Sequence, residues 1–350
     1  YLYGKLPAME GKKEIPALGF IAHMDTVSDF CDHEIRPMVT ENYDGGDLVL
    51  GTSGLVLSPK EFPHLTGLKG RTLLTSDGTT ILGADDKAGI AEILTMIERI
   101  QTENRPHGTI CVAFTPDEEI GMGAEHFNLD QFGAEYAYTL DGDSEGEIQY
   151  ENFNACKAEF EIRGFNVHPG EGKDTMINAS LVAIEINNCL PSMETPRGTE
   201  DYEGFYHLIS MQGEVGEAKL NYIVRDHDKN GFEERKKTLR LIEKNLNAKW
   251  GEGTVTLKIT DQYLNMKEIV EEHIHLIDHA KKACEAAGVA PLILPIRGGT
   301  DGCQLSFKGL PCPNLGTGGH AFHGPYEHIS VEGMEKSVEL LLALIQEYTK

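Results

Sequence analysis

Basic residues are scarce in this sequence, and long apolar runs are absent. Only 31 of its 350 residues are Lys or Arg, against 56 Asp or Glu, which gives a formal net charge of −25 at pH 7. Phosphate backbones and anionic lipid surfaces are bound mainly through basic patches. No apolar run approaches the roughly 18 residues of a membrane span. The composition therefore argues against nucleic-acid and membrane partners. It fits either a solvated acidic surface or carboxylates gathered around divalent cations.

Cysteine pairing motifs are also missing. The seven cysteines are odd in number and scattered, and none forms a CxxC pair. Such cysteines are typical of reduced thiols, which favours a cytoplasmic location over a disulfide scaffold. At roughly 100–200 residues per domain, the length favours two domains.

The first 140 residues have the hydrophobic pattern of three buried strands and a helix. Residues 17–25 form an apolar run that ends in polar residues, residues 87–100 have helical apolar spacing, and runs 109–115 and 136–140 again resemble buried strands. This order predicts right-handed crossovers in a mostly parallel sheet. His23, Glu118, Glu119 and Asp141 then follow the carboxyl ends of strands, the edge where α/β sheets bind ligands.

Residues 153–265 have a different pattern, with strands and helices in the order β-α-β-β-α-β, which predicts a split βαβ domain. The expected fold is α/β. A mostly parallel-sheet catalytic domain (residues 1–152 and 266–350) is interrupted by a smaller ferredoxin-like domain (residues 153–265). From residue 267 the sequence predicts a long helix, a buried strand at 292–295 and a final helix that begins after Ser330.

Five segments carry metal-ligating residue types at strand ends or in tight loops. They are His23-Met-Asp25, Gly83-Ala-Asp85-Asp86-Lys87, Asp117-Glu118-Glu119, Leu140-Asp141-Gly142 and Ala321-Phe-His323-Gly324. Each is weak alone. Together they offer imidazoles and carboxylates, a donor set that suits a pair of Zn²⁺, Mn²⁺ or Co²⁺ ions.

In this order, the HxD, GADDKAG, PDEE, DG and HG segments resemble the M20 family of co-catalytic metallopeptidases. The NVHPG, EGFYHLISM and IRGGTDG stretches are similar to the tripeptide aminopeptidases of that family. The resemblance implies a cytoplasmic homodimer with two Zn²⁺ per chain, Co²⁺ or Mn²⁺ being alternatives. It would release the N-terminal residue from unblocked tripeptides, and the smaller domain would serve as lid and dimerisation domain.

The resemblance also implies residue roles. His23 and Asp141 would bind one metal, Glu119 and His323 the other, and Asp85 would bridge both, with a cis peptide bond between Asp85 and Asp86. A carboxylate suits the bridge because it has two oxygens.

Further roles concern catalysis and substrate binding. Glu118 would be the general base, and Asp25 would hold the second ring nitrogen of His23. His168 would reach the active site of the partner subunit and stabilise the oxyanion, while Arg225 and Arg297 would anchor the carboxylate of the peptide.

Several alternatives stay open. Other members of the family act as dipeptidases, carboxypeptidases or deacylases of N-acyl amino acids, and a non-catalytic peptide-binding or metal-binding module would also fit. His275 and His279 have the spacing of a zinc helix, but Leu276 stands where the HExxH motif needs Glu, so we interpret them as a solvated helix face. His23 comes early in the chain, and we expect that an N-terminal segment of the catalytic domain is missing.

Overall fold

The computed structural model describes residues 1–350 and divides into two compact units. The first comprises Tyr1–Tyr150, Met266–Leu294 and Thr300–Lys350, and the second comprises Glu151–Asn265 and Pro295–Gly299. Residues Pro295–Gly299, which the sequence assigns to the catalytic domain, thus pack with the second unit.

A seven-stranded sheet forms the centre of the first unit. Its strands, in spatial order, are β1 (Leu2–Leu6), β7 (Ile110–Thr115), β2 (Leu18–His23), β8 (Tyr136–Gly142), β15 (Asn314–Gly316), β9 (Glu147–Gln149) and β14 (Leu292–Ile293). The neighbours from β7 to β15 run parallel, which confirms the predicted mostly parallel sheet. Every residue of β2 and β7 is buried. Burial on both faces explains why these strands are uninterrupted apolar runs in the sequence.

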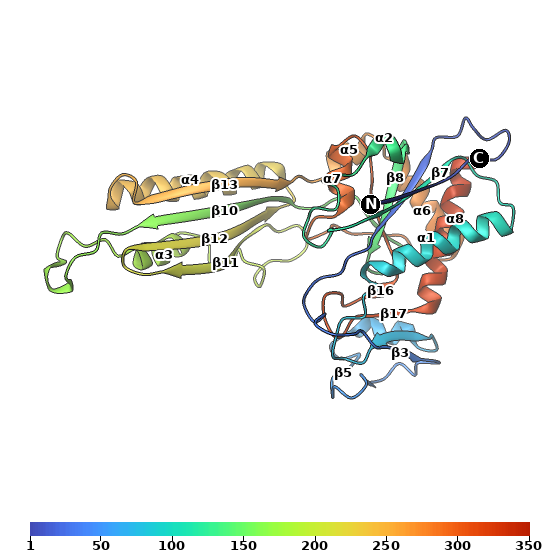
Figure 1. Ribbon diagram of the computed structural model, residues 1–350, viewed down its shortest axis with the longest axis horizontal. Coiled ribbons are helices and arrows are strands. Elements are labelled where there is room, and N and C mark those ends of the chain that lie inside the picture. Colours follow the sequence, from blue (N-terminus) through green and yellow to red (C-terminus); the bar gives the residue numbers. More distant parts are fainter. The chain divides into compact units, whose positions relative to one another are not determined.

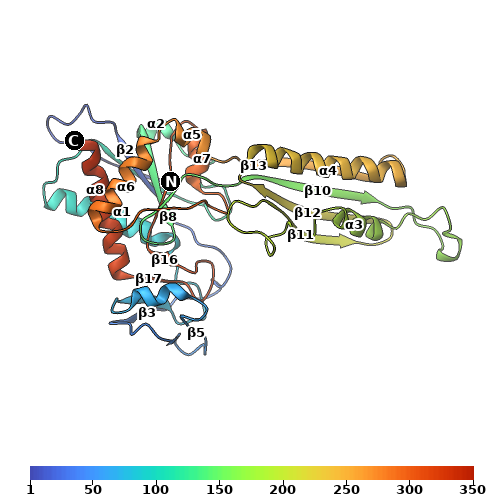
Figure 2. The same cartoon turned by 180° about the vertical axis from the view of Figure 1, so that it is seen from behind.

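Helices cover both faces of this sheet. On one face Ile21 packs in a core with residues of α2 (Leu129–Phe132) and α7 (Asp301–Phe307). The preceding residue of β2, Phe20, points the other way and stacks on Tyr138 with ring centroids 6.3 Å apart. The Tyr138 hydroxyl donates to the Leu276 carbonyl of α6 (His275–Ala287). On this face α8 (Val331–Thr349) packs against both α6 and α1 (Ala84–Thr102) (Figure 2).

A second, antiparallel sheet in the first unit was not predicted. Its order is β16 (Gly319–His320), β17 (His328–Ser330), β6 (Leu73–Ser76) and β3 (Pro37–Thr40). Near it lie the pair β4 (Leu48–Val49) and β5 (Val56–Leu57) and the short helix η1 (Pro63–Leu68), whose leucines share one core with Leu73. The pairing of β17 with β6 brings the C-terminal region next to the segment that leads into α1.

The second unit has the predicted order of strands and helices. It consists of β10 (Asn154–Arg163), η2 (Pro169–Glu171), α3 (Ala179–Asn188), β11 (Phe205–Gly213), β12 (Glu217–Asp226), α4 (Lys229–Trp250) and β13 (Val255–Tyr263). The sheet order β11-β12-β10-β13 is fully antiparallel. Both helices share one apolar core with alternate residues of the strands, so the unit is a two-layer sandwich (Figure 1).

Three predictions about the C-terminal third were wrong. The expected long helix is two helices, α5 (Lys267–Glu271) and α6, and the expected buried strand at 292–295 is the exposed edge strand β14. His275 and His279 are half-buried against aromatic rings, 4.8 Å from Tyr136 and 4.6 Å from Tyr348 between centroids, rather than on a solvated face. Ser330 caps α8 as predicted, accepting from the Gly333 N–H. None of the helices is long and apolar enough to span a membrane.

Glu92 on α1 generates a prediction about stability. Its side chain is 1% exposed, neither carboxyl oxygen has a hydrogen-bond partner, and burial raises its pKa well above the usual value. The native state therefore binds this proton more tightly than the unfolded state, and stability falls as pH rises above the unfolded pKa of about 4.3. Relative to Glu92→Gln, the free energy of unfolding of the wild type should fall by about 1.4 kcal/mol per pH unit until the native pKa is reached.

Urea unfolding between pH 5 and 7 measures this slope. Glu98→Gln on the exposed face of the same helix is the control and should keep the wild-type slope. Parallel curves for the wild type and Glu92→Gln would contradict the prediction.

Candidate metal centre

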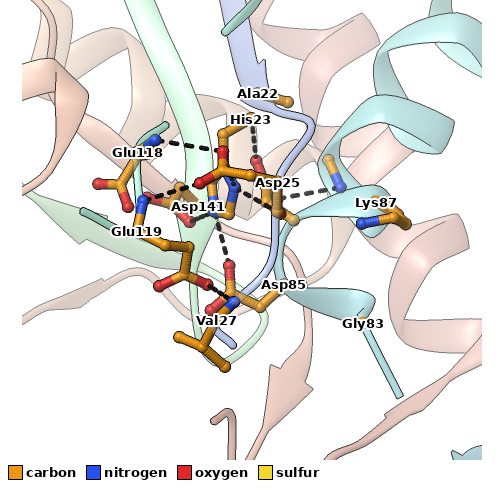
Figure 3. Close-up of polar contacts among 12 residues, drawn as sticks. Ala22, His23, Asp25, Val27, Gly83, Asp85, Lys87, Glu118, Glu119 and Asp141 are labelled. Carbon is orange, nitrogen blue, oxygen red and sulfur yellow. Dashed lines mark hydrogen bonds and ion pairs between the residues drawn. The ribbon is translucent and has the colours of Figure 1, made fainter. Parts of the chain in front are cut away.

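Two groups of metal-ligating side chains meet in the first unit and share one residue. The first group is His23, Asp85 and Asp141, and the second is Asp85, Glu119 and His323; in each group the candidate ligand atoms lie within 4.8 Å of one another. Figure 3 shows four of these residues converging from β2, β8, the loop after β7 and the start of α1.

The first group forms where neighbouring parallel strands end. His23 is the last residue of β2, and Asp141 lies near the end of the adjacent strand β8. The Nε2 atom of His23 is 2.8 Å from Asp85 Oδ1 and 3.4 Å from Asp141 Oδ1. One imidazole nitrogen thus faces two carboxylates.

The second group uses the other oxygen of Asp85. His323 Nε2 lies 3.0 Å from Asp85 Oδ2 and 3.2 Å from Glu119 Oε2. The remaining Glu119 oxygen, Oε1, accepts from the Val27 N–H at 3.2 Å. Asp85 therefore presents one oxygen to each group, and its peptide bond to Asp86 is cis, as the resemblance implies.

Asp25 links the His23 strand to the loop that carries the two glutamates. Its backbone carbonyl is 3.1 Å from His23 Nδ1, and its Oδ1 is 3.4 Å from the same nitrogen. Its carboxylate also accepts from the Glu118 and Glu119 N–H groups, both at 3.1 Å (Figure 3). The sequence predicts the contact with His23 but not the bonds to the glutamate backbone.

The pKa values show how strongly these groups interact. Burial would lower the pKa of His23, but hydrogen bonds to Asp141, Asp25 and Asp85 raise it. Hydrogen bonds to Asp85 and Glu119 raise the pKa of His323 to about 10. Burial would raise the pKa of Asp25, yet bonds from His23 and the glutamate N–H groups lower it to about 2. Each imidazole thus lies between carboxylates whose negative charge stabilises a positive charge at that position.

The donor set fits two divalent cations. Each group offers one imidazole nitrogen and carboxylate oxygens, the ligands that Zn²⁺ and similar ions take in sites that keep an open position. The two groups contain three carboxylates and two imidazoles. Even with both histidines protonated, a negative charge remains, and bound cations would neutralise it. Desolvation raises the pKa of Asp141 to about 6, and the negative charges of Asp85 and Glu119 add to the shift, while His23 opposes it.

Glu118 lies next to this set without belonging to either group. It lines a small cavity with His23, Asp141 and Asp301. Burial raises the pKa of Glu118 well above its usual value, and the negative charges of Asp141 and Asp301 add to the shift.

Three further residues, which the sequence does not predict, support the ligands. The Asp86 carboxylate accepts from the His23 N–H at 3.0 Å, and Asn314 Oδ1 accepts from the Asp141 N–H at 3.0 Å. Glu327 accepts from the N–H of Asp85 at 3.0 Å. All three bond to the backbone of a ligand, and such contacts leave no residue-type signature in a motif.

The remaining predicted site residues lie in the second unit. His168 is exposed, and its Nδ1 accepts from the Gly170 N–H at 3.2 Å. Arg225 is 9% exposed and donates to the carbonyls of Cys156 and Val224. Arg297 is exposed and donates to the carbonyls of residues 199, 201 and 203.

The fold and this pair of groups define a class of hydrolase, and comparison with known proteins gives the family. The sequence profile of Peptidase family M20/M25/M40 matches residues 78–347. The chain belongs to this peptidase family and is an enzyme, a peptidase.

Its relatives include proteins named Peptidase T. The chain is 52% identical to Peptidase T of Caldanaerobacter subterraneus subsp. tengcongensis, over 97% of this chain and 83% of that protein. It is 54% identical to Peptidase T of Desulfitobacterium hafniense, over 100% of this chain and 86% of that protein. The crystal structure of aminopeptidase PepT from Bacillus cereus matches with a TM-score of 0.79 at 26% identity, covering 99% of this chain and 84% of that one.

The contacts of Asp25 predict how its substitution changes cation affinity. In Asp25→Asn, one acceptor oxygen faces two backbone N–H donors, and the new amide N–H₂ opposes one of them. We expect cation affinity to fall by roughly 10–100-fold, as for other residues that orient ligands. Chelator competition with Zn²⁺ measures it.

Asp44→Asn is the matched control, because Asp44 accepts the Gly46 N–H in an exposed turn and should leave the affinity unchanged. An Asp25→Asn protein with wild-type affinity would refute the link between Asp25 and the ligands.

Proposed function

We propose that this chain is an aminopeptidase that releases the N-terminal residue from unblocked tripeptides, with two divalent cations held by the groups that share Asp85. Zn²⁺ is the proposed metal, with Co²⁺ or Mn²⁺ as alternatives. The observation that carries the proposal is the Asp85 carboxylate, which faces His23 with one oxygen and His323 with the other. More than 50% identity to proteins named Peptidase T supports the substrate class.

In this proposal His23, Asp141 and Asp85 hold one cation, and Asp85, Glu119 and His323 hold the other. Cations bound there would supply Lewis acidity that activates water and polarises the scissile carbonyl. Glu118 accepts a proton from the attacking water on its carboxylate and returns it to the nitrogen of the leaving amine. Asp25 keeps the His23 ring and the Glu118 backbone aligned through the bonds described above.

The remaining proposed roles belong to residues of the second unit. Because His168 Nδ1 accepts from the Gly170 N–H, a neutral ring carries its proton on Nε2. An Nε2–H donor suits a developing oxyanion, which supports the proposal that His168 serves the active site of the partner subunit in a homodimer.

For the carboxylate of the peptide we propose Arg297 and Arg225, since guanidinium groups bind carboxylates in a bidentate manner. Arg297 is exposed and already oriented by the carbonyls of residues 199–203, whereas Arg225 is nearly buried. Arg297 is therefore the better supported of the two. A cytoplasmic location is supported by the seven free thiols.

A panel of substrates tests the function directly. Mass spectrometry of products from free tripeptides, dipeptides, tetrapeptides, N-acetylated tripeptides and N-acyl amino acids, with and without chelator, should give chelator-sensitive loss of the N-terminal residue from free tripeptides alone. Cleavage of acylated substrates would contradict the proposal and indicate a deacylase. Binding without cleavage of any substrate would favour a non-catalytic module.

Glu118→Gln tests the base. The amide cannot accept the proton, so the variant should bind two cations per chain yet lose tripeptide hydrolysis by a factor on the order of 10²–10⁴. Metal analysis and steady-state kinetics measure both. Glu125→Gln, an exposed residue further along the same loop, should keep full activity.

A mixture of Glu118→Gln and His168→Ala chains extends this test. If His168 serves its neighbour, mixed dimers contain one intact site and recover part of the activity. Unchanged turnover in Glu118→Gln alone would rule out the base, and no recovery in mixed dimers that have formed would rule out the cross-subunit role.

A further inference from the structure

Glu327 makes an unusual set of contacts next to the metal centre. It lies in the segment before β17, and its side chain is 1% exposed. Its Oε2 accepts from the N–H groups of Leu82 and Gly83 at 2.7 and 2.8 Å, and its Oε1 accepts from the Asp85 N–H at 3.0 Å. One carboxylate thus bonds three backbone groups more than 240 residues away in sequence.

These N–H groups need an acceptor from elsewhere. The Asp85 N–H lies in the first turn of α1, where N–H groups have no partner within the helix, and Leu82 and Gly83 directly precede this helix. The usual acceptor is the side chain of the N-cap residue, but here that residue is Gly83, with φ of 78°. Glycine has no side chain, so this first turn has no side-chain cap, and Glu327 supplies the acceptor from another part of the chain. The regular helix follows the non-helical residues Asp85 and Asp86 and has its own cap, because Asp86 Oδ1 accepts from the Gly89 N–H at 3.3 Å.

Glu327 also connects the two sides of the second group. It lies four residues after His323, and its own N–H donates to the Gly324 carbonyl at 3.1 Å. The segment that carries His323 therefore also holds the backbone of Asp85. The separation of 3.0 Å between Asp85 Oδ2 and His323 Nε2 depends on both ends of this connection.

We propose that Glu327 is a positioning residue that fixes the Asp85 backbone relative to the His323 segment, and thereby sets how Asp85 is shared between the two cations. This inference rests on the proposed function for the two cation groups. Glu327 itself contacts backbone only in these bonds and takes no part as a ligand. Its effect should appear in the coordination of both cations, since Asp85 belongs to both groups.

A matched pair of variants tests the proposal in the full chain loaded with Co²⁺. In Glu327→Gln, a single carbonyl oxygen replaces the two acceptors, and the amide N–H₂ faces at least one of the backbone donors. Glu332→Gln is the control, because the Glu332 carboxylate accepts from the Thr72 N–H at 2.9 and 3.1 Å in the same unit without contacting either cation group.

We expect Glu327→Gln to bind Co²⁺ roughly 10–100-fold more weakly, with an altered d–d absorption spectrum and an unchanged far-UV circular dichroism spectrum. Glu332→Gln should keep the wild-type affinity and d–d spectrum even if its melting temperature falls. A purely structural role would lower the melting temperature of both variants and leave both d–d spectra as in the wild type, which would overturn the proposal.

If Glu327→Gln does not fold, Glu327→Asp replaces it in the test. Asp keeps the charge and both acceptor oxygens but is shorter by one methylene, so the expected result is a smaller loss of affinity with the same direction of spectral change. Wild-type affinity and spectrum in Glu327→Asp would overturn the proposal.

The outcomes separate this proposal from the proposed function. Wild-type protein that binds two Co²⁺ without cleaving tripeptides would refute the function. The d–d spectra of the Glu327 variants would then still decide the role of Glu327. Cleavage with unchanged spectra in Glu327→Gln would refute only the role of Glu327. Wild-type protein that binds no cation would refute both.

Discussion

The two oxygens of the Asp85 carboxylate face two different imidazoles, and the arrangement of the candidate metal centre depends on this division. Oδ1 is 2.8 Å from His23 Nε2 and Oδ2 is 3.0 Å from His323 Nε2. A carboxylate can serve both groups because its two oxygens are equivalent acceptors. The division holds only if strand β2, the start of α1 and the segment before β17 keep fixed positions.

Carboxylates hold these segments together through backbone N–H groups. Asp25 accepts from Glu118 and Glu119, Asp86 from His23, and Glu327 from the loop that leads to Asp85. Backbone donors satisfy a carboxylate without adding a full positive charge. The centre therefore stays anionic, and its negative charge is available to cations. Lysine or arginine in these positions would compete with the metals that the donor set fits.

The sequence predicted the parts of the fold that have a strong hydrophobic period. Strands β2, β7 and β8 are buried on both faces, and the order of elements in the second unit follows from alternating strand and helix patterns. The sheet that contains β6 and β17 was missed, because its strands have two to four residues, too few to form a period. The apolar residues of β14 predict a buried strand, although this strand is an exposed sheet edge.

The candidate ligands could be predicted because the segments that carry them resemble, in this order, those of the M20 family. Glu327 could not, because it acts on backbone groups and its partners are far away in sequence.

Anomalous diffraction at the zinc edge, from crystals of the Zn²⁺-loaded protein, tests the central claim most directly. The account predicts two peaks, one among His23, Asp85 and Asp141 and the other among Asp85, Glu119 and His323, with the Asp85 carboxylate between them. A single peak, or two peaks that do not share Asp85, would contradict it.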